Sequence, residues 1–237
     1  MMTFSRSQPN ELFRFLARVS AGRRVRHCLT VLVAFTFLLA GSTQAWSRDR
    51  ILIVGNSFTK GIKSDLRNLA RSALRDVSVS VRGRAGATLN DHAVSRSTLR
   101  KLRIPGWHSV VLQDQSDGID EERYPGARVL DAEIAAIGAD TIFFMTWADQ
   151  DDEIEVYDEL RGVPGGTEGY VPIAMELDAV VAPIGWAFRE LLLEGPDAEL
   201  WRQDGHHAGD RGRYLAALVL YAVIYRESPV GLWATPR

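Results

Sequence analysis

Apolar and polar positions along residues 51–226 predict strands and helices in alternation. Short apolar or alternating runs predict strands, and apolar positions three or four apart predict helices. The predicted strands cover residues 51–55, 77–82, 108–113, 141–147 and 179–184, and the predicted helices cover residues 59–75, 88–102, 127–138, 171–179, 186–193 and 210–226. This order is typical of an α/β fold in which helices cover both faces of a parallel sheet.

Three segments allow more specific expectations. The helix over residues 59–75 is expected to bury one stripe, and residues 141–147 are apolar enough for a strand inside the sheet. Residues 149–170 are acidic and rich in glycine, which favours a surface loop. The predicted buried stripe consists of Ile62, Leu66, Leu69, Ala70, Ala73 and Leu74.

The first 45 residues have the order of a secretory signal peptide. Residues 1–27 carry six arginines and one acid, residues 28–40 are apolar, and Thr43 and Ala45 supply small residues. This pattern predicts cleavage after Ala45 and export to the periplasm or the cell exterior. An uncleaved anchor is the alternative, although the apolar run is shorter than the ~20 residues of a membrane span. We therefore expect a single domain over residues 46–237, without stable membrane insertion.

Removing this leader changes the charge. The full chain has 28 basic and 30 acidic residues, whereas residues 46–237 have 22 and 29, a formal charge of −7. This sign disfavours a nucleic-acid or anionic-membrane partner. The only cysteine, Cys28, lies in the leader, so cysteine catalysis and cysteine-zinc sites are excluded from the exported part. The remaining length suffices for one hydrophobic core.

Polar and glycine residues follow the predicted strands. In open parallel sheets, ligands bind beyond the carboxyl ends of the strands, so residues at these positions are expected to meet at one edge. A further polar cluster stands before the last helix. The five groups are Gly55-Asn56-Ser57, Gly83-Arg84-Ala85-Gly86, Gln113-Asp114-Gln115-Ser116, Thr146-Trp147 and Asp204-Gly205-His206-His207.

These groups contain the parts of a nucleophilic site. The hydroxyl of Ser57 needs a base, and histidine, with an unperturbed pKa of ~6.5, suits that task. Asp204 stands three residues before His207 and could orient its ring. Each residue also has a simpler reading: Ser57 or Asp204 as a helix cap, Gly86 as a turn residue, Gln113 as a satisfied amide. Their joint appearance at strand ends favours the nucleophile.

The chain resembles the SGNH/GDSL hydrolase family over residues 50–232. Gly55-Asn56-Ser57 matches the first block of that family, with Asn in place of Asp, and Gly86 matches the second. Asp204-Gly205-His206-His207 with Gly212 matches the last block. The third block departs, because Leu112-Gln113-Asp114-Gln115-Ser116 replaces Gly-x-Asn-Asp. The resemblance implies a three-layer α/β/α flavodoxin-like sandwich with about five parallel strands.

The resemblance also implies a serine hydrolase that works through an acyl-enzyme. Ser57 would attack an ester carbonyl, His207 would move the proton, and Asp204 would orient His207. The N–H groups of Ser57 and Gly86 and the amide of Gln113 would bind the oxyanion, with Gln115 as the reserve donor, because glutamine can donate as asparagine does. The mechanism requires no cofactor or metal.

Export and the acidic surface favour O-acyl esters of carbohydrates, above all acetyl esters, or small esters as substrates. Asn56 and Trp147 are expected to contact the substrate, and Tyr170 and Trp186 are further aromatic candidates for stacking on sugar rings. Two alternatives remain open. One is a flavodoxin-like binding module in which residues 56–59 hold a phosphate at a helix N-terminus. The other is an inactive relative that binds glycans.

Overall fold

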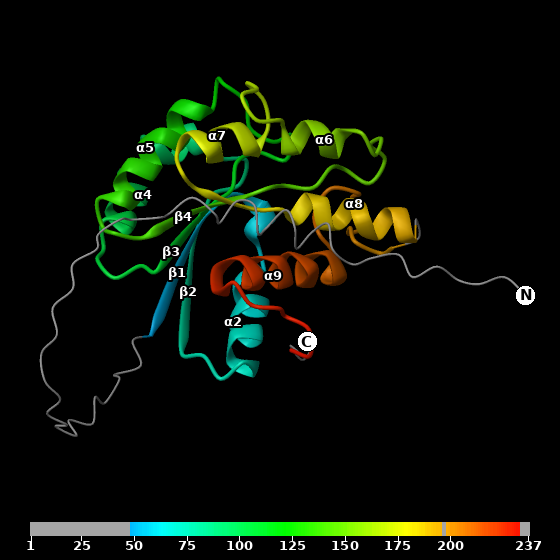
Figure 1. Ribbon diagram of the computed structural model, residues 1–237, viewed down its shortest axis with the longest axis horizontal. Helices are drawn as coiled ribbons and strands as arrows, with labels where there is room; N and C mark the ends of the chain where they lie inside the picture. The colour runs from blue at the N-terminus through cyan, green and yellow to red at the C-terminus, as the bar shows by residue number, and fades with distance from the viewer. Residues whose placement is uncertain (1–47, 196–197, 233–237) are drawn as a thin grey trace, which may run out of the picture. The chain divides into compact units, whose positions relative to one another are not determined.

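In the part of the chain that the structure describes, five parallel strands form one sheet in the order β2-β1-β3-β4-β5 (Figure 1). The structure is a computed structural model, and it describes residues 48–195 and 198–232. The strands are β1 (Asp49–Gly55), β2 (Val77–Gly83), β3 (Ser109–Leu112), β4 (Asp140–Phe144) and β5 (Val180–Ala182). The predicted signal peptide, residues 1–45, lies outside the described residues.

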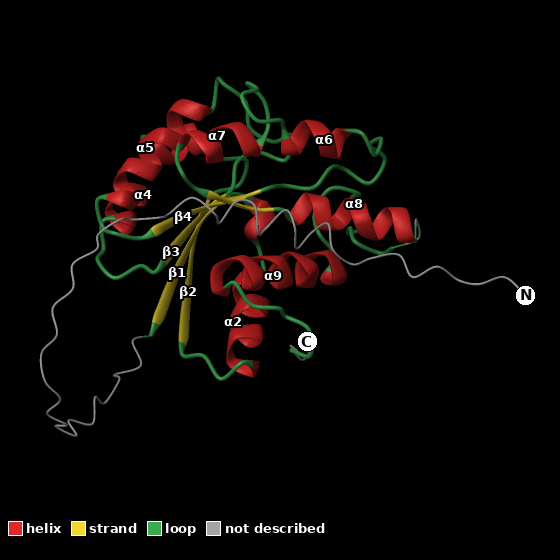
Figure 2. Ribbon diagram, in the orientation of Figure 1, coloured by secondary structure: helices red, strands yellow, loops and turns green. Residues whose placement is uncertain are grey.

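Helices cover both faces of this sheet, as Figure 2 shows, so the prediction of a three-layer α/β/α fold is confirmed. One face carries η1 (Ser57–Thr59), α2 (Ile62–Ser72) and α9 (Asp210–Tyr225), and α2 packs on α9. The other carries α3 (Leu89–Ala93), α4 (Arg96–Leu102), α5 (Tyr124–Ala135) and α7 (Tyr170–Glu176). The remaining helices are α6 (Val156–Arg161) and α8 (Ile184–Glu194), which pack against each other.

Burial of the strands follows from this layering. Residues 51–54 of β1 are fully buried, as are the apolar residues of β3, because helices cover them on both faces. Strand β4 pairs with β3 and β5, which confirms the expectation that its segment lies inside the sheet. Strand β2 is an edge strand in which Val77 and Val79 are buried and the last three residues, from Val81 on, are at least partly exposed. No helix in the described residues has the length and apolarity that crossing a membrane would require.

Local capping explains where the helices differ from the predictions. The helix predicted over residues 59–75 starts at Ile62, after a turn at Gly61 with φ of 88°. Leu74 is 87% exposed with φ of 59°, so its predicted place in the buried stripe is wrong. The helix predicted over residues 88–102 is two helices, because the Ser95 hydroxyl accepts the Thr98 N–H and starts a new helix.

The segment 149–170 is only partly a surface loop. It contains α6, and Tyr157 and Leu160 of that helix are buried. The helix was not predicted because acidic residues dominate this segment. Only two apolar side chains, three positions apart, indicate a buried face.

The order of the strands places a crevice between β1 and β3. The chain runs from β1 to β2 on one side, and β3 pairs with the other side of β1. The chain thus continues to opposite sides after β1 and after β3. Ligands of open α/β sheets bind at this point, where the strand order reverses. The loops that begin at Asn56 and Gln113 leave the sheet side by side at this point, because Val54 and Leu112 are paired.

Candidate active site

Ser57 lies in a tight turn directly after β1. Asn56 caps the single turn of 3₁₀ helix that begins at Ser57, because its Oδ1 accepts the Phe58 N–H at 3.1 Å. The preceding Gly55 has no room for a side chain, since a Cβ there would collide with Gln113. This turn leaves the Ser57 side chain at the surface while the residues on both sides of it are buried.

The structure brings Ser57, His207 and Asp204 into one hydrogen-bonded chain. His207 Nε2 lies 3.0 Å from Ser57 Oγ, and His207 Nδ1 lies 2.9 Å from Asp204 Oδ2. Asp204 Oδ1 accepts the backbone N–H of His206 at 3.0 Å and of His207 at 2.9 Å. These backbone N–H groups, that of His207 first, lower the pKa of Asp204, which keeps the carboxylate ionised. A nucleophile, a base and an orienting group are thus in contact.

The adjacent histidine has a different partner. His206 Nδ1 lies 2.6 Å from Asp149 Oδ1, and its ring meets the edge of Phe58 at 4.8 Å between centroids. No hydrogen bond joins His206 to Ser57 in the described residues. His207 is therefore the histidine placed to take the serine proton.

Backbone contacts hold the loop of His207 against the segment after β4. Trp147 Nε1 donates to the His206 carbonyl at 3.0 Å, and the Gln150 N–H donates to the Gly205 carbonyl at 2.8 Å. The Arg202 N–H also donates to the His207 carbonyl at 2.8 Å. These bonds fix a loop that has no regular secondary structure of its own.

Trp147 packs beneath the turn that carries Ser57, inside the protein, and does not face the substrate. It is fully buried between Phe58 and Phe188, with ring centroids 4.4 and 4.9 Å away and planes within 7°. The expectation that Trp147 contacts the substrate is therefore wrong. Tyr170 is also fully buried, and Trp186 lies under the guanidinium groups of two arginines. The faces of these three aromatic rings are covered by neighbouring side chains and are not available for stacking on sugars.

Asn56 connects three loops of the rim. It is 5% exposed, and its Nδ2 donates to the Asp114 carbonyl at 3.1 Å, to Gln115 Oε1 at 3.2 Å and to the Ala87 carbonyl at 3.3 Å. A buried side chain with these partners is not available to the substrate, which corrects its expected role. An aspartate here would set a carboxylate against three oxygens, and this explains the asparagine in the first block.

The two glutamines after β3 have different environments. Gln113 is fully buried, its Oε1 accepts the Asn56 N–H at 2.7 Å, and its Nε2 donates to the Asp114 carbonyl. Because Gln113 has no exposed surface, its amide cannot reach a substrate, which contradicts its expected role as an oxyanion donor. Gln115 is partly exposed on the rim, and its Nε2 donates to the Gly86 carbonyl at 2.8 Å. The amide beside the second block is thus that of Gln115.

Asp114, between the two glutamines, is a site residue that the sequence interpretation missed. It is fully buried, and its Oδ1 accepts the N–H of Gln115 at 2.8 Å and of Leu89 at 3.3 Å. Its Oδ2 has no hydrogen-bond partner among the described residues. Burial raises the pKa of Asp114 to about 7, although Arg123 and the two N–H groups favour ionisation. The signal in the sequence was an acid two residues after the apolar run of residues 110–112.

Two backbone N–H groups on the rim are open. Neither the Ser57 nor the Gly86 N–H donates to an acceptor within the described residues. Gly86 has φ of 65°, a conformation that favours glycine, and the space beside its Cα is empty. The Gln115 amide gives one N–H to the carbonyl of Gly86, and its second N–H has no acceptor within the described residues, so these loops carry three free donors.

Two hollows of the described residues lie away from Ser57. One, of about 480 Å³, lies between α5, α7 and the loop before α7, and no residue of the Ser57-His207-Asp204 chain lines it. Among residues 48–195 and 198–232, no three His, Cys, Asp or Glu side chains are arranged to hold a metal ion. The candidate site therefore lies apart from this hollow, at the carboxyl end of the sheet.

Comparisons with known proteins agree with this architecture. No family model matches the chain, and no curated protein is found as a relative. Among solved structures, the chain is similar to a candidate SGNH hydrolase from Slackia heliotrinireducens, with 29% identity, a TM-score of 0.55, and coverage of 73% of this chain and 97% of that one.

Two more distant structures share the fold. The psychrotrophic esterase EstA from Pseudoalteromonas sp., solved with monoethylphosphonate as inhibitor, matches with 14% identity, a TM-score of 0.55, and coverage of 75% and 97%. TesA matches with 14% identity, a TM-score of 0.51, and coverage of 73% and 98%. The parallel five-stranded sheet is thus that of the SGNH hydrolase fold, and the 29% identity to the Slackia heliotrinireducens protein supports the SGNH/GDSL hydrolase family for this chain.

Proposed function

We propose that the protein is an exported serine esterase that uses Ser57, His207 and Asp204 as a catalytic triad. The observation that carries the proposal is the unbroken chain of contacts from Ser57 Oγ through His207 to Asp204, at the carboxyl end of β1. This geometry is the one that nucleophilic acyl transfer needs. Esterases among the structural neighbours support the same reaction class.

The reaction begins when Ser57 Oγ attacks the ester carbonyl and His207 Nε2 takes the hydroxyl proton. The negative charge that develops on the carbonyl oxygen is bound by the N–H groups of Ser57 and Gly86, with the amide of Gln115 in the place first expected for Gln113. His207 then gives its proton to the leaving alcohol. Water, activated by His207, attacks the acyl-enzyme, releases the acid and restores Ser57.

The substrates proposed are short O-acyl esters, above all acetyl esters, of carbohydrates or small alcohols. Phe58 and Trp147, the apolar side chains beside the serine, are buried and stacked on one another, so neither offers an exposed apolar surface to a long acyl chain. The rim around the serine is formed by backbone groups and by polar side chains. A polar rim suits a hydroxylated alcohol.

Export rests on the sequence of residues 1–45, whose arginines, apolar run and small residues are those of a secretory leader. Expression in a bacterial host and N-terminal sequencing of the exported fraction would test it. A mature chain that begins at Trp46 is expected. A chain that keeps its first residues in the membrane fraction would instead show an anchor.

Labelling with a fluorophosphonate probe tests the triad. The wild-type chain should be labelled at Ser57 and should hydrolyse p-nitrophenyl acetate. Ser57→Ala should abolish the labelling, and His207→Ala should lower both activities at least about 10³-fold. His206→Ala is the matched control, because it removes the neighbouring ring and should retain labelling. Failure of the folded wild-type chain to label or hydrolyse would reject the enzyme and favour a binding module.

A panel of substrates tests the acyl and alcohol groups. p-Nitrophenyl acetate, butyrate and palmitate, together with acetylated xylan and acetylated peptidoglycan sugars, should show the fastest release for acetate. If palmitate is preferred, the proposed short acyl group is wrong. Acyl transfer to an added alcohol at the expense of free acid would identify the protein as an acyltransferase.

A further inference from the structure

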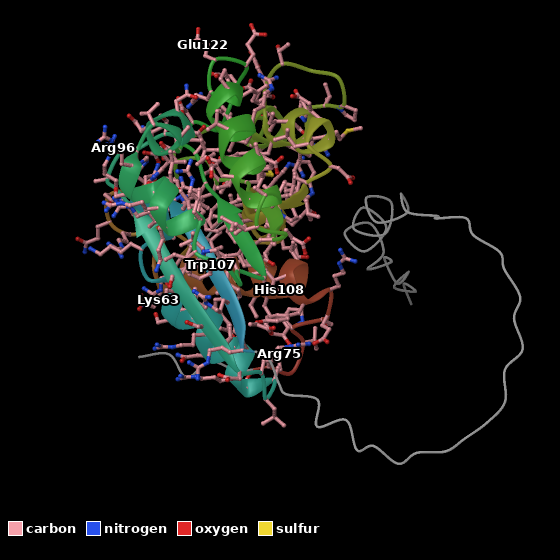
Figure 3. The ribbon with its side chains drawn as sticks, turned by 90° about the vertical axis from the view of Figure 1, so that its left-hand side faces the viewer. Lys63, Arg75, Arg96, Trp107, His108 and Glu122 are labelled. Atoms are coloured by element: carbon pink, nitrogen blue, oxygen red, sulfur yellow. The ribbon has the colours of Figure 1, made fainter. Side chains whose placement is uncertain are left out.

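Positive and negative charges are separated along the chain. Residues 48–104 contain 13 Lys and Arg against 4 Asp and Glu, a charge of +9, whereas residues 105–237 contain 9 against 25, a charge of −16. The first segment builds β1, β2, α2, α3 and α4, around the edge of the sheet that β2 forms. Figure 3 shows this side, with Lys63 and Arg96 at its surface. The side of the molecule around β2 is thus strongly basic, although the net charge of the chain is negative.

The basic charges converge on a hollow between α2 and the beginning of β2. Its volume is about 230 Å³, and it is lined by Lys63, Arg67, Arg71 and Arg48, with Asp76 as the only acid. Arg48 pairs with Asp76 at 3.0 Å. No ion pair within the described residues engages the three cations of α2. We call these three residues and this hollow the α2 groove.

The fold itself gives no reason for this row of charges. Lys63, Arg67 and Arg71 are each four residues apart, so they lie on one face of α2, where like charges repel and destabilise a helix. The acid in the first turn, Asp65, bonds to Arg213 of α9 and does not neutralise them. An anionic ligand in the α2 groove would relieve the repulsion.

The spacing of the charges indicates the shape of that ligand. A helix rises ~1.5 Å per residue, so the three cations are ~6 Å apart and span ~12 Å along the axis. Guanidinium groups match phosphate oxygens in pairs. No aromatic residue lines the hollow, so it offers no face for stacking nucleobases. We propose that the α2 groove binds a linear phosphate-bearing polymer through its regularly spaced charges.

The α2 groove is separate from the esterase site. The groove lies beside the start of β2, where Asp49 pairs with Val77, and the site lies beyond the other end, where Gly55 pairs with Gly83. Six residues of strand at ~3.3 Å each put ~20 Å between the site and the end of the groove at Arg48. None of Ser57, His207 and Asp204 lines the groove, so the proposal does not depend on the reaction at Ser57.

Binding of long-chain inorganic polyphosphate to the full-length chain tests the proposal. The variant K63Q/R67Q/R71Q removes the α2 charges, and R96Q/R100Q/K101Q removes the same number and kinds of charge from α4. The α2 variant should bind about 10- to 100-fold more weakly, and the slope of log Kd against log salt should fall by about 2 to 3. The α4 variant should change Kd less than about threefold. The arginines of residues 1–27 are common to all three chains.

Three results would overturn the proposal. Equal losses of affinity in the two variants would show nonspecific attraction to positive charge and no site in the α2 groove. If the wild-type chain does not bind polyphosphate, the proposed ligand is wrong. Equal or tighter binding of polygalacturonate or a single-stranded oligonucleotide would reject the ligand class. Hydrolysis of p-nitrophenyl acetate should be the same in all three chains, so a failure of the proposed esterase would be seen separately.

Discussion

Asp204 and Asp114 are two carboxyl groups on the same rim whose pKa values are shifted in opposite directions. Asp204 is exposed and accepts two backbone N–H bonds beside His207, which lowers its pKa. Asp114 is fully buried, and burial raises its pKa to about 7. Both accept two backbone N–H bonds, so the difference in pKa comes from the burial of Asp114 and from the additional contact of Asp204 with His207.

The comparison separates a residue placed for chemistry from one placed for architecture. Asp204 stays charged and turned toward a histidine that must carry a proton. Asp114 faces no reacting atom, and its Oδ1 joins the loop after β3 to the start of α3. It therefore fixes the distance between the Gln115 amide and Gly86. Loss of Asp204 should be felt in catalysis, and loss of Asp114 first in stability.

The largest effect is expected for Asp204→Asn. The amide keeps an oxygen for the N–H groups of His206 and His207, but it cannot stabilise a protonated His207. The kcat for p-nitrophenyl acetate should fall about 10²- to 10⁴-fold. The free energy of unfolding in urea should change by less than about 1 kcal/mol, since the side chain is exposed. Activity within tenfold of wild type would show that Asp204 does not orient the base.

Substitution of the two glutamines beside Asp114 should likewise separate an effect on catalysis from an effect on stability, with smaller changes. Gln115→Leu should lower kcat about 10²-fold with little change in stability, because an oxyanion donor is lost. Gln113→Leu should lower the free energy of unfolding by about 1–3 kcal/mol, because it leaves the Asn56 N–H buried without its acceptor. The reverse pattern would return the donor role to Gln113.

Asp114→Ala should lower the free energy of unfolding by about 2–4 kcal/mol, since the N–H groups of Gln115 and Leu89 lose their acceptor inside the protein. Asp114→Asn keeps Oδ1 and should cost less than half as much. Urea unfolding of the three chains measures this difference. If Ala and Asn cost the same, the hydrogen bonds of Oδ1 are not what stabilises this corner.

The pH dependence of stability should show the raised pKa of Asp114. Between pH 4 and pH 7 the unfolded chain has lost this proton and the folded chain keeps it, so the contribution of Asp114 to stability falls as pH rises. A shift from 3.8 to about 7 bounds the effect at about 4 kcal/mol. The difference in unfolding free energy between wild type and Asp114→Asn should therefore change by 1 kcal/mol or more between pH 4.5 and pH 7.5. A constant difference would show that Asp114 titrates normally.

The sequence predicted the residues whose meeting depends on strand order. Ser57 follows the first strand, Gly86 the second, and Asp204 precedes His207 by one turn, so the rule for parallel sheets was enough to place them on one rim. Asn56 and Trp147 were misread, because whether a residue at a strand end faces the crevice or the core depends on the loops packed over it. The prediction of Gln113 as the oxyanion donor was wrong for the same reason. Gln113 and Gln115 are two residues apart after the same strand, and the sequence does not show which of them is buried.

The fold was predicted with similar strengths and failures. Every strand that the structure describes overlaps a predicted one, because buried parallel strands are apolar throughout. The split of the helix over residues 88–102 depended on one capping serine, Ser95, within a polar run. Helix α6 was missed, because two core residues in an acidic segment give almost no periodicity.

The 150 residues that separate Ser57 from His207 determine when reactivity can arise. Ser57 directly follows the first strand and His207 lies in the loop before the last helix, so nearly the whole chain must be synthesised and folded before the two can touch. Contacts of such long range form slowly. A nascent or translocating chain is accordingly harmless to esters around it. Reactivity of Ser57 toward the fluorophosphonate probe, sampled during refolding, would report completion of the fold.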